Sequence, residues 1–166
     1  MWFNSESALK KQGFEGFRDV DSLTNDMNSH SLRIEGRKGI YIMLYNGRDR
    51  PTFVEEGSGG WFKGKNPNYC LKTVEGRWIE GAMVLYIGKT DRPLRTRISE
   101  FLKFGQGHNI GHRGGRLVWQ IQNRENLELC WMNTESDSES LGEIERRMIA
   151  EFKDAFGRRP YANISA

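Results

Sequence analysis

Several features that mark other protein classes are scarce in this chain. It has only two cysteines and four prolines in 166 residues. Cys70 and Cys130 are too few for a disulfide-built scaffold, and they lack the paired spacing of a zinc site. No stretch approaches the roughly 18 consecutive apolar residues of a membrane span, and no basic, then apolar secretory leader is visible. We therefore expect a cytoplasmic protein with no membrane partner.

Bulky apolar side chains, by contrast, are plentiful. The chain contains nine Phe, five Trp and five Tyr, and 37% of its residues are hydrophobic. This composition supplies a core and argues against disorder as the main state. The length is that of one ordinary domain, so we expect residues 1–166 to form a single domain with an N-terminal extension over residues 1–38.

Charge is distributed unevenly along the chain. The 25 Lys and Arg exceed the 22 Asp and Glu by three. Residues 88–116 are strongly basic, whereas residues 125–151 are rich in acids. A basic middle segment suits a polyphosphate partner such as DNA, but it also suits an ordinary solvated surface, which charge alone favours.

Hydrophobic patterning predicts the main elements. Short β-rich runs bounded by turn residues predict strands at 39–45, 83–88 and 127–132. Periodic segments with Pro, Ser or Gly at their ends predict helices at 5–12, 94–104 and 138–156. Leu117–Ile121 fits either type. The order predicts an α+β fold: a small central antiparallel sheet of about three strands, with the first two paired and helices on its faces.

The last predicted helix carries a carboxylate on its apolar side. At about 100° per residue, its apolar positions define one face, and Glu145 lies within that face while Glu143 points away. A carboxylate on a buried stripe needs a partner, either a metal ion or an arginine. In the preceding helix, Arg95 and Arg97 flank the apolar face about equally, so periodicity does not choose between them.

Two tripeptides occupy the first two predicted strands, and further motifs follow in a fixed order. The motif residues are Gly39-Ile40-Tyr41, Tyr86-Ile87-Gly88, Lys89, Arg97 on a helix, a glutamate on a later helix, and Pro160-Tyr-Ala-Asn163. In this order, over residues 39–163, the chain resembles the GIY-YIG nuclease family. The resemblance implies an endonuclease that hydrolyses DNA phosphodiester bonds with one Mg²⁺ or Mn²⁺ ion.

The resemblance also implies roles for these residues. Tyr41 would act as general base or position the attacking water, and Tyr86 would hydrogen-bond the water or the phosphate. Arg97 would neutralise the scissile phosphate, with Arg95 as an alternate phosphate ligand. Because tyrosine is a weak base at its usual pKa of about 10, nearby cations would have to lower that pKa.

Three further residues complete the implied site. Glu145 would bind the metal ion, Lys89 would supply a cation near Tyr41, and Asn163 would help to anchor the site. Gly39 and Gly88 would permit a close approach of neighbouring groups, although a glycine there could also simply end a strand.

The chain departs from the family between its two tyrosines. In the family a short hairpin joins the two strands, so residues 46–82 form an insertion here. Trp61, Lys63 and Lys65 in this insertion could stack bases and contact phosphates. The alternative is a hairpin in which Trp61 and Trp78 form a small core of their own.

Two residues of the Gly-rich loop after the Arg97 helix, His112 and Arg116, are further DNA-binding candidates. His112 could equally be a loop residue without a chemical role. No separate DNA-binding domain is evident, so recognition would come from the insertion, from residues 1–38 or from a homodimer. The alternative function is a catalytically silent nucleic-acid-binding module of the same fold.

Overall fold

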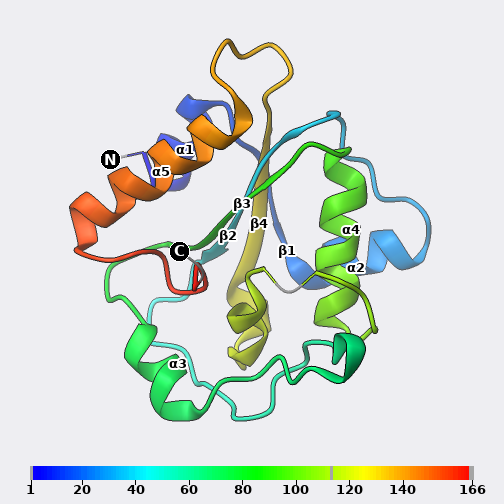
Figure 1. Cartoon of the computed structure of the whole chain (residues 1–166), viewed down its shortest axis with the longest axis vertical. Helices are drawn as coiled ribbons and strands as arrows, with labels where there is room; N and C mark the ends of the chain where they lie inside the picture. The colour runs from blue at the N-terminus through cyan, green and yellow to red at the C-terminus, as the bar shows by residue number, and fades with distance from the viewer. Residues whose placement is uncertain (1, 113, 165–166) are drawn as a thin grey trace.

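The computed structural model describes residues 2–112 and 114–164, which form an α+β fold (Figure 1). The strands in these residues are β1 (Glu15–Asp19), β2 (Gly39–Tyr45), β3 (Val84–Thr90) and β4 (Leu127–Asn133). The α-helices are α1 (Glu6–Gln12), α2 (Val20–Asn28), α3 (Leu71–Arg77), α4 (Leu94–Gly105) and α5 (Leu141–Phe156). Short 3₁₀ helices occur at Phe62–Gly64, Arg116–Gln120 and Arg124–Asn126. No helix among the described residues is long and apolar enough to span a membrane.

The sheet has four strands rather than about three. Its order is β1-β4-β2-β3, and every neighbouring pair is antiparallel, including the predicted β2–β3 pair. The additional strand, β1, lies at one edge and pairs with β4 across a bulge between Gly16 and Arg18. Its sequence, Glu-Gly-Phe-Arg-Asp, has no apolar run, so the pairing depends on β4 and not on local preference.

Local signals set the ends of the predicted helices. The Ser5 side chain caps α1, and Ser140 forms a capping box with Glu143 at the start of α5. Gly13 and Gly157 end these two helices in the left-handed conformation, with φ of 108° and 79°. The predicted boundaries of the two helices therefore hold to within about three residues.

Helices cover both faces of the sheet, and each face has its own core (Figure 1). Ile40, Ile42 and Leu44 of β2 pack in the cluster that contains the apolar residues of α1 and α5. The alternate residues, Tyr41 and Met43, pack in the cluster that includes α2 and α4. Arg97 on α4 and Glu145 on α5 thus belong to helices on opposite faces.

The C-terminal segment runs along β3, the edge strand of the sheet. The Ala162 amide donates to the Leu85 carbonyl at 2.8 Å. The Asn163 side chain accepts from the Ile87 amide and donates to the Ile87 carbonyl, both at 2.9 Å. The segment therefore takes up hydrogen-bonding groups that an edge strand would otherwise expose.

The insertion between β2 and β3 is not a hairpin. It contains the 3₁₀ turn at Phe62–Gly64 and the helix α3. Trp78 is buried against Tyr45 and Tyr161, whereas Trp61 is 54% exposed. The interpretation of Trp61 and Trp78 as one small core is therefore wrong. The ambiguous segment at Leu117–Ile121 is mostly a 3₁₀ helix.

Candidate active site

Tyr41 and Tyr86 lie on the same face of the β2–β3 pair. Tyr41 is paired with Gly88 across the two strands, and its ring lies over that glycine. A Cβ at Gly88 would come within 2.5 Å of Tyr41 Cζ and 2.7 Å of its hydroxyl. The ring of Tyr86 is 6.0 Å from that of Tyr41 and stacks on Phe101 of α4. Gly88 therefore allows the two tyrosines to occupy one pocket.

His112 contacts Tyr41 from the loop that follows α4. Its side chain is fully buried, and Nε2 lies 3.5 Å from the Tyr41 hydroxyl, a long hydrogen bond. The imidazole packs edge-on against Phe101, with ring centroids 4.9 Å apart. Its Nδ1 atom is buried without a hydrogen-bond partner among the described residues. The sequence placed His112 in the DNA-binding set, and the structure places it against the tyrosine.

The pKa of His112 is lowered to about 3, first by burial and then by the positive charges of Arg97 and Arg92. The imidazole is therefore neutral in the folded protein at ordinary pH. A neutral imidazole can accept a hydrogen bond from the Tyr41 hydroxyl.

This depressed pKa makes a prediction about stability and pH. Below about pH 6.5 the unfolded chain protonates His112, whereas the folded protein does not until near pH 3. Acidification through that window therefore destabilises the fold by about 1.4 kcal/mol per pH unit. In His112→Gln, this contribution is absent, and the fall in unfolding free energy between pH 7 and 5 should shrink by about 2 kcal/mol. Urea unfolding of both proteins at each pH tests this, and equal falls would contradict it.

The pKa of the Tyr41 phenol is raised overall in the free protein. Burial raises it, while the charge of Arg97 and hydrogen bonding to Arg97 and Tyr86 lower it in part. The pKa of Tyr86 is raised further by its own burial and by Tyr41. Arg97 is thus the cation that acts on Tyr41, in the role that the sequence assigned to Lys89. Both phenols hold their protons at neutral pH.

An ion-pair network holds Arg97. Glu100, one turn further along α4, accepts from Arg97 at 3.3 Å and from Arg92 at 3.1 Å. Burial raises the pKa of Glu100, but the two arginines outweigh this and hold it below its usual range. Glu100 therefore stays ionised and draws the two guanidinium groups together. The motifs do not reveal this network, although the Arg97–Glu100 spacing of three helical residues is a sequence signal for it.

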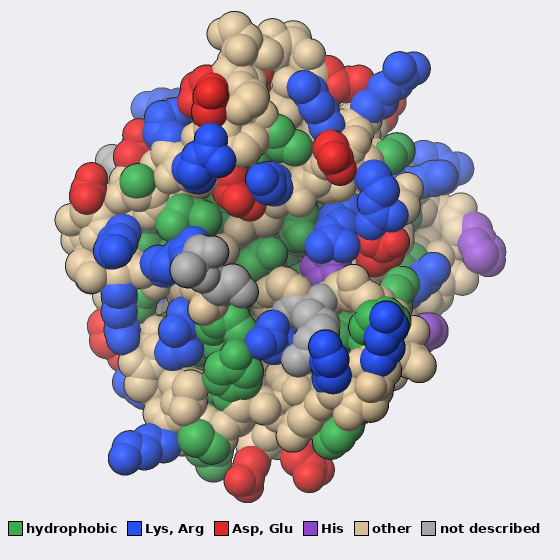
Figure 2. Space-filling model, viewed as in Figure 1, with side chains coloured by type: hydrophobic (Ala, Val, Ile, Leu, Met, Phe, Trp, Pro, Cys, Tyr) green, Lys and Arg blue, Asp and Glu red, His purple; other side chains and the backbone are tan. Residues whose placement is uncertain are grey.

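A cavity of about 510 Å³ lies beside this network. Lys89, Arg92 and Arg97 line one part of it, and the first residues of α5, from Ser140 to Gly142, line another. Figure 2 views this side of the molecule, where Lys and Arg side chains surround a hollow with hydrophobic side chains at its base. Asp91 also lines the cavity, but the three cations outnumber it, and with the helix N-terminus they favour a phosphate group.

Glu145 lies on α5, which packs next to β3 on the opposite face of the sheet from Tyr41. Its negative charge raises the pKa of both Tyr41 and Tyr86, although α5 packs on the face opposite to them. Burial raises the pKa of Glu145, and the charges of Lys89, Arg159 and Arg146 lower it in part. Lys89, whose Nζ lies near Gly142 on α5, therefore acts on this carboxylate.

Glu145 is the carboxylate at which the resemblance places a Mg²⁺ or Mn²⁺ ion. The described residues contain no group of three or more His, Cys, Asp or Glu that could hold a metal. Glu145 is only partly buried, and its carboxylate makes no ion pair within 4.0 Å with a described residue. Mg²⁺ often binds through one carboxylate, water and substrate phosphate. Lys89, Arg159 and Arg146 place positive charge beside this carboxylate.

The Asn163 side chain binds the backbone of β3. Its amide oxygen and nitrogen are both engaged with the backbone of Ile87, between Tyr86 and Gly88. This leaves the side chain little capacity to contact a substrate. It ties the C-terminal segment to the strand that carries Tyr86.

The other DNA-binding candidates lie in two separate parts of the structure. Arg95 lies away from Tyr41, in a cavity between α2 and α4. Lys63 lies in the insertion, where its amide donates to the Asn109 side chain at 3.2 Å. The insertion segment with Trp61 thus packs on the loop that carries His112. Arg116 donates to the Tyr69 hydroxyl at 2.9 Å and so joins that loop to the insertion.

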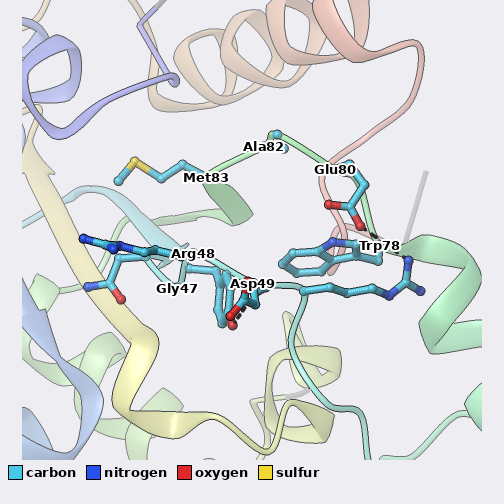
Figure 3. A pocket seen from close by; sticks show the side chains of 11 residues that line it. Gly47, Arg48, Asp49, Trp78, Glu80, Ala82 and Met83 are labelled. Carbon is cyan, nitrogen blue, oxygen red and sulfur yellow. Dashed lines mark hydrogen bonds and ion pairs between the residues drawn. The ribbon is translucent and has the colours of Figure 1, made fainter.

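A separate cavity of about 330 Å³ lies at the far end of the β2–β3 pair (Figure 3). Arg48, Asp49 and the turn after β2 line one side, and Trp78 and the residues before β3 line the other. None of the site residues named above lines it.

Comparison of the chain with known proteins finds no matching family model, no similar curated protein and no matching solved structure. The function is therefore argued from the motifs and the geometry of the site.

Proposed function

We propose that this protein is a metal-dependent endonuclease of the GIY-YIG type that hydrolyses DNA phosphodiester bonds with one Mg²⁺ or Mn²⁺ ion. The observation that carries the proposal is a set of four groups, of which three lie together at Tyr41 while the charge of the fourth, on α5, also acts on Tyr41. These groups are the Tyr41 hydroxyl, the neutral His112 imidazole, the Arg97 guanidinium and the Glu145 carboxylate. General acid–base groups, a phosphate-binding cation and a metal ligand are what such hydrolysis requires.

The raised pKa of Tyr41 sets how water is activated. A protonated phenol can accept a proton from water only if it gives up its own proton, and His112 Nε2 is the acceptor within reach. In the proposed step, a water oxygen attacks phosphorus while its proton moves to Tyr41 and the phenol proton moves to His112. The bond from phosphorus to the ester oxygen of the leaving strand then breaks, and that oxygen takes a proton from solvent water.

Substrate binding prepares this relay. Tyr41 has no exposed surface in the free protein, so a covering side chain must move before water reaches it. Arg97 is paired with Glu100, and its charge also lowers the pKa of Tyr41. A phosphate in the cavity lined by Lys89 and Arg92 would attract the Arg97 guanidinium away from Tyr41. The phosphate charge would also raise the pKa of His112 and make it a better proton acceptor.

The metal ion on Glu145 would neutralise the negative charge that develops on the phosphate. Asn163 and Gly88 keep Tyr86 and Tyr41 in position. Lys63, Lys65 and Trp61 in the insertion are proposed to contact DNA beyond the cavity, and a homodimer would extend that contact. Both cysteines are free, which suits the cytoplasm.

A cleavage assay with Tyr41→Phe tests the proposal. Wild-type protein should cut supercoiled plasmid in Mg²⁺ or Mn²⁺ but not in EDTA. The variant should cut about 100-fold more slowly, because it loses the general acid–base group. Tyr45→Phe is the matched control, since Tyr45 lies on the same strand and face and its hydroxyl donates to the Asp49 carbonyl. Salt-sensitive DNA binding without cutting by the wild type would instead favour the silent binding module.

A further inference from the structure

A cluster of basic side chains gathers where α5 ends, apart from the cavity of Lys89 and Arg97. Arg77 of α3, Lys153 of α5, and Arg158 and Arg159 of the following segment line a pocket of about 240 Å³. No acidic side chain is among the described residues that line it. Figure 2 shows Lys and Arg side chains gathered over this end of α5.

Backbone carbonyls, rather than carboxylates, hold two of these arginines. Arg77 donates to the carbonyls of Tyr161 and Asn163 at 2.7 and 3.3 Å. Arg158 donates to the carbonyls of Gly76 and Trp78 at 2.8 and 2.5 Å. No carboxylate of a described residue lies within 4.0 Å of Arg77, Lys153 or Arg158. The guanidinium groups are thus fixed in place while their charge stays unneutralised.

The cluster carries electrostatic strain that an anion would relieve. The pKa of Arg77 is lowered first by burial and then by the charge of Arg158, with a smaller effect of Arg159. Like charges that are held together in a partly buried pocket repel one another. A bound phosphate would turn this repulsion into attraction and form charge-assisted hydrogen bonds.

The cluster also adjoins the proposed catalytic groups. Arg159 lowers the pKa of Glu145 as well as that of Arg77, so its charge acts on both the carboxylate and the cluster. Asn163 lines the pocket and binds β3 at Ile87. The pocket is therefore held at a fixed position relative to Tyr86 and Gly88.

We propose that Arg77, Lys153, Arg158 and Arg159 form a second phosphate site, which binds the DNA backbone to one side of the phosphate that is cut. This inference rests on the proposed function and adds to it a positioning site for the substrate strand. It also explains why the insertion carries Arg77 at the end of α3, where the side chain reaches the C-terminal segment.

Lys153→Glu is the variant that tests this site. Lys153 is exposed and lies in the last turn of α5. Lys11→Glu is the matched control, because Lys11 is also exposed and lies in the last turn of α1, away from the pocket. The full-length proteins are titrated against a fluorescein-labelled duplex in EDTA at several salt concentrations, and their melting temperatures confirm folding.

At moderate salt, Lys153→Glu should raise Kd about tenfold and reduce the slope of log K against log salt by about 0.9, the effect of one lost phosphate contact. Lys11→Glu should change Kd by less than about twofold. Equal effects of the two variants would overturn the second phosphate site.

Cleavage of the same duplex in Mg²⁺ separates this site from the proposed function. If the wild type cuts and the two variants bind alike, the second site is wrong and the nuclease stands. If the wild type binds without cutting and only Lys153→Glu weakens binding, the second site stands and the nuclease is wrong. If inorganic phosphate alone protects the wild type from unfolding as strongly as the duplex does, the site is a small-anion site and not one for the DNA backbone.

Discussion

Glu145→Gln should reduce metal-dependent DNA cutting by about 10³-fold or more, because a metal ion supplies several kcal/mol of charge stabilisation in such reactions. Glutamine keeps the size of the side chain but has no negative charge to hold a divalent cation. Raising the Mg²⁺ concentration should restore little of the activity. DNA affinity in EDTA should stay the same or increase, because a negative charge near the phosphate is removed.

Glu143→Gln is the matched control for this experiment. Glu143 lies on the same helix, is exposed, and accepts from the Ser140 amide in the capping box. Glutamine serves in a capping box as well, so this variant should fold and cut like the wild type. Rates of plasmid cleavage, measured for both variants over a range of Mg²⁺ concentrations, show whether only Glu145→Gln loses activity. If Glu145→Gln cut as fast as Glu143→Gln, Glu145 would not be the metal ligand.

Glu145→Gln should also leave the fold as stable as before, or more stable, at neutral pH. Burial holds the pKa of Glu145 above its usual value, so the ionised form is less favourable in the folded protein than in the unfolded chain. Stability at this residue is therefore lost as pH rises through that raised pKa, and a neutral amide avoids the loss. Thermal melts at pH 7 would show this. An intact fold with lost activity separates a functional role from a structural one.

Gly39→Ala should destabilise the protein by about 3 kcal/mol, the upper range for forced overpacking. A Cβ at Gly39 would lie 2.1 Å from the Met132 carbonyl oxygen of β4 and 3.0 Å from Leu94. The first neighbour is backbone within the sheet, so it cannot move aside without breaking the pairing of β2 with β4. For a protein of this size, the melting temperature should fall by about 10 °C.

Gly76→Ala is the matched control for Gly39→Ala. Gly76 lies in α3, and a Cβ there meets no atom within 4 Å. Because alanine favours helix more than glycine does, this variant should gain up to about 1 kcal/mol. The two substitutions are chemically identical and should shift the urea midpoint in opposite directions. Similar shifts would mean that the packing around Gly39 is looser than the structure indicates.

The fold was predictable where local patterns are strong. The apolar runs of β2, β3 and β4 and the capped, periodic helices α4 and α5 appear in the sequence close to their observed positions. β1, α2 and α3 were missed. Each is short, and each depends on contacts distant in the chain, such as the pairing of Glu15 with Trp131. Short segments of this kind have too little hydrophobic periodicity to be identified from the sequence.

The candidate site was predictable only as a set of residues. The motifs identify Tyr41, Tyr86, Arg97 and Glu145, but they do not say how the side chains are paired. The contact of His112 with Tyr41 joins separate segments of the chain. These two residues are 71 positions apart in the sequence. Periodicity within one element cannot reveal such a contact.

The sequence by itself determined the α+β class, the paired strands of the two tripeptides and the helices that carry Arg97 and Glu145, because each depends on local propensity and spacing. Only the tertiary structure decided the protonation of the site. The raised pKa of Tyr41 and the lowered pKa of His112 come from burial and from the nearby arginines, and both are properties of the assembled core. The tertiary structure likewise gathered Arg77, Lys153 and Arg158, from the insertion and the C-terminal part of the chain, into one basic pocket.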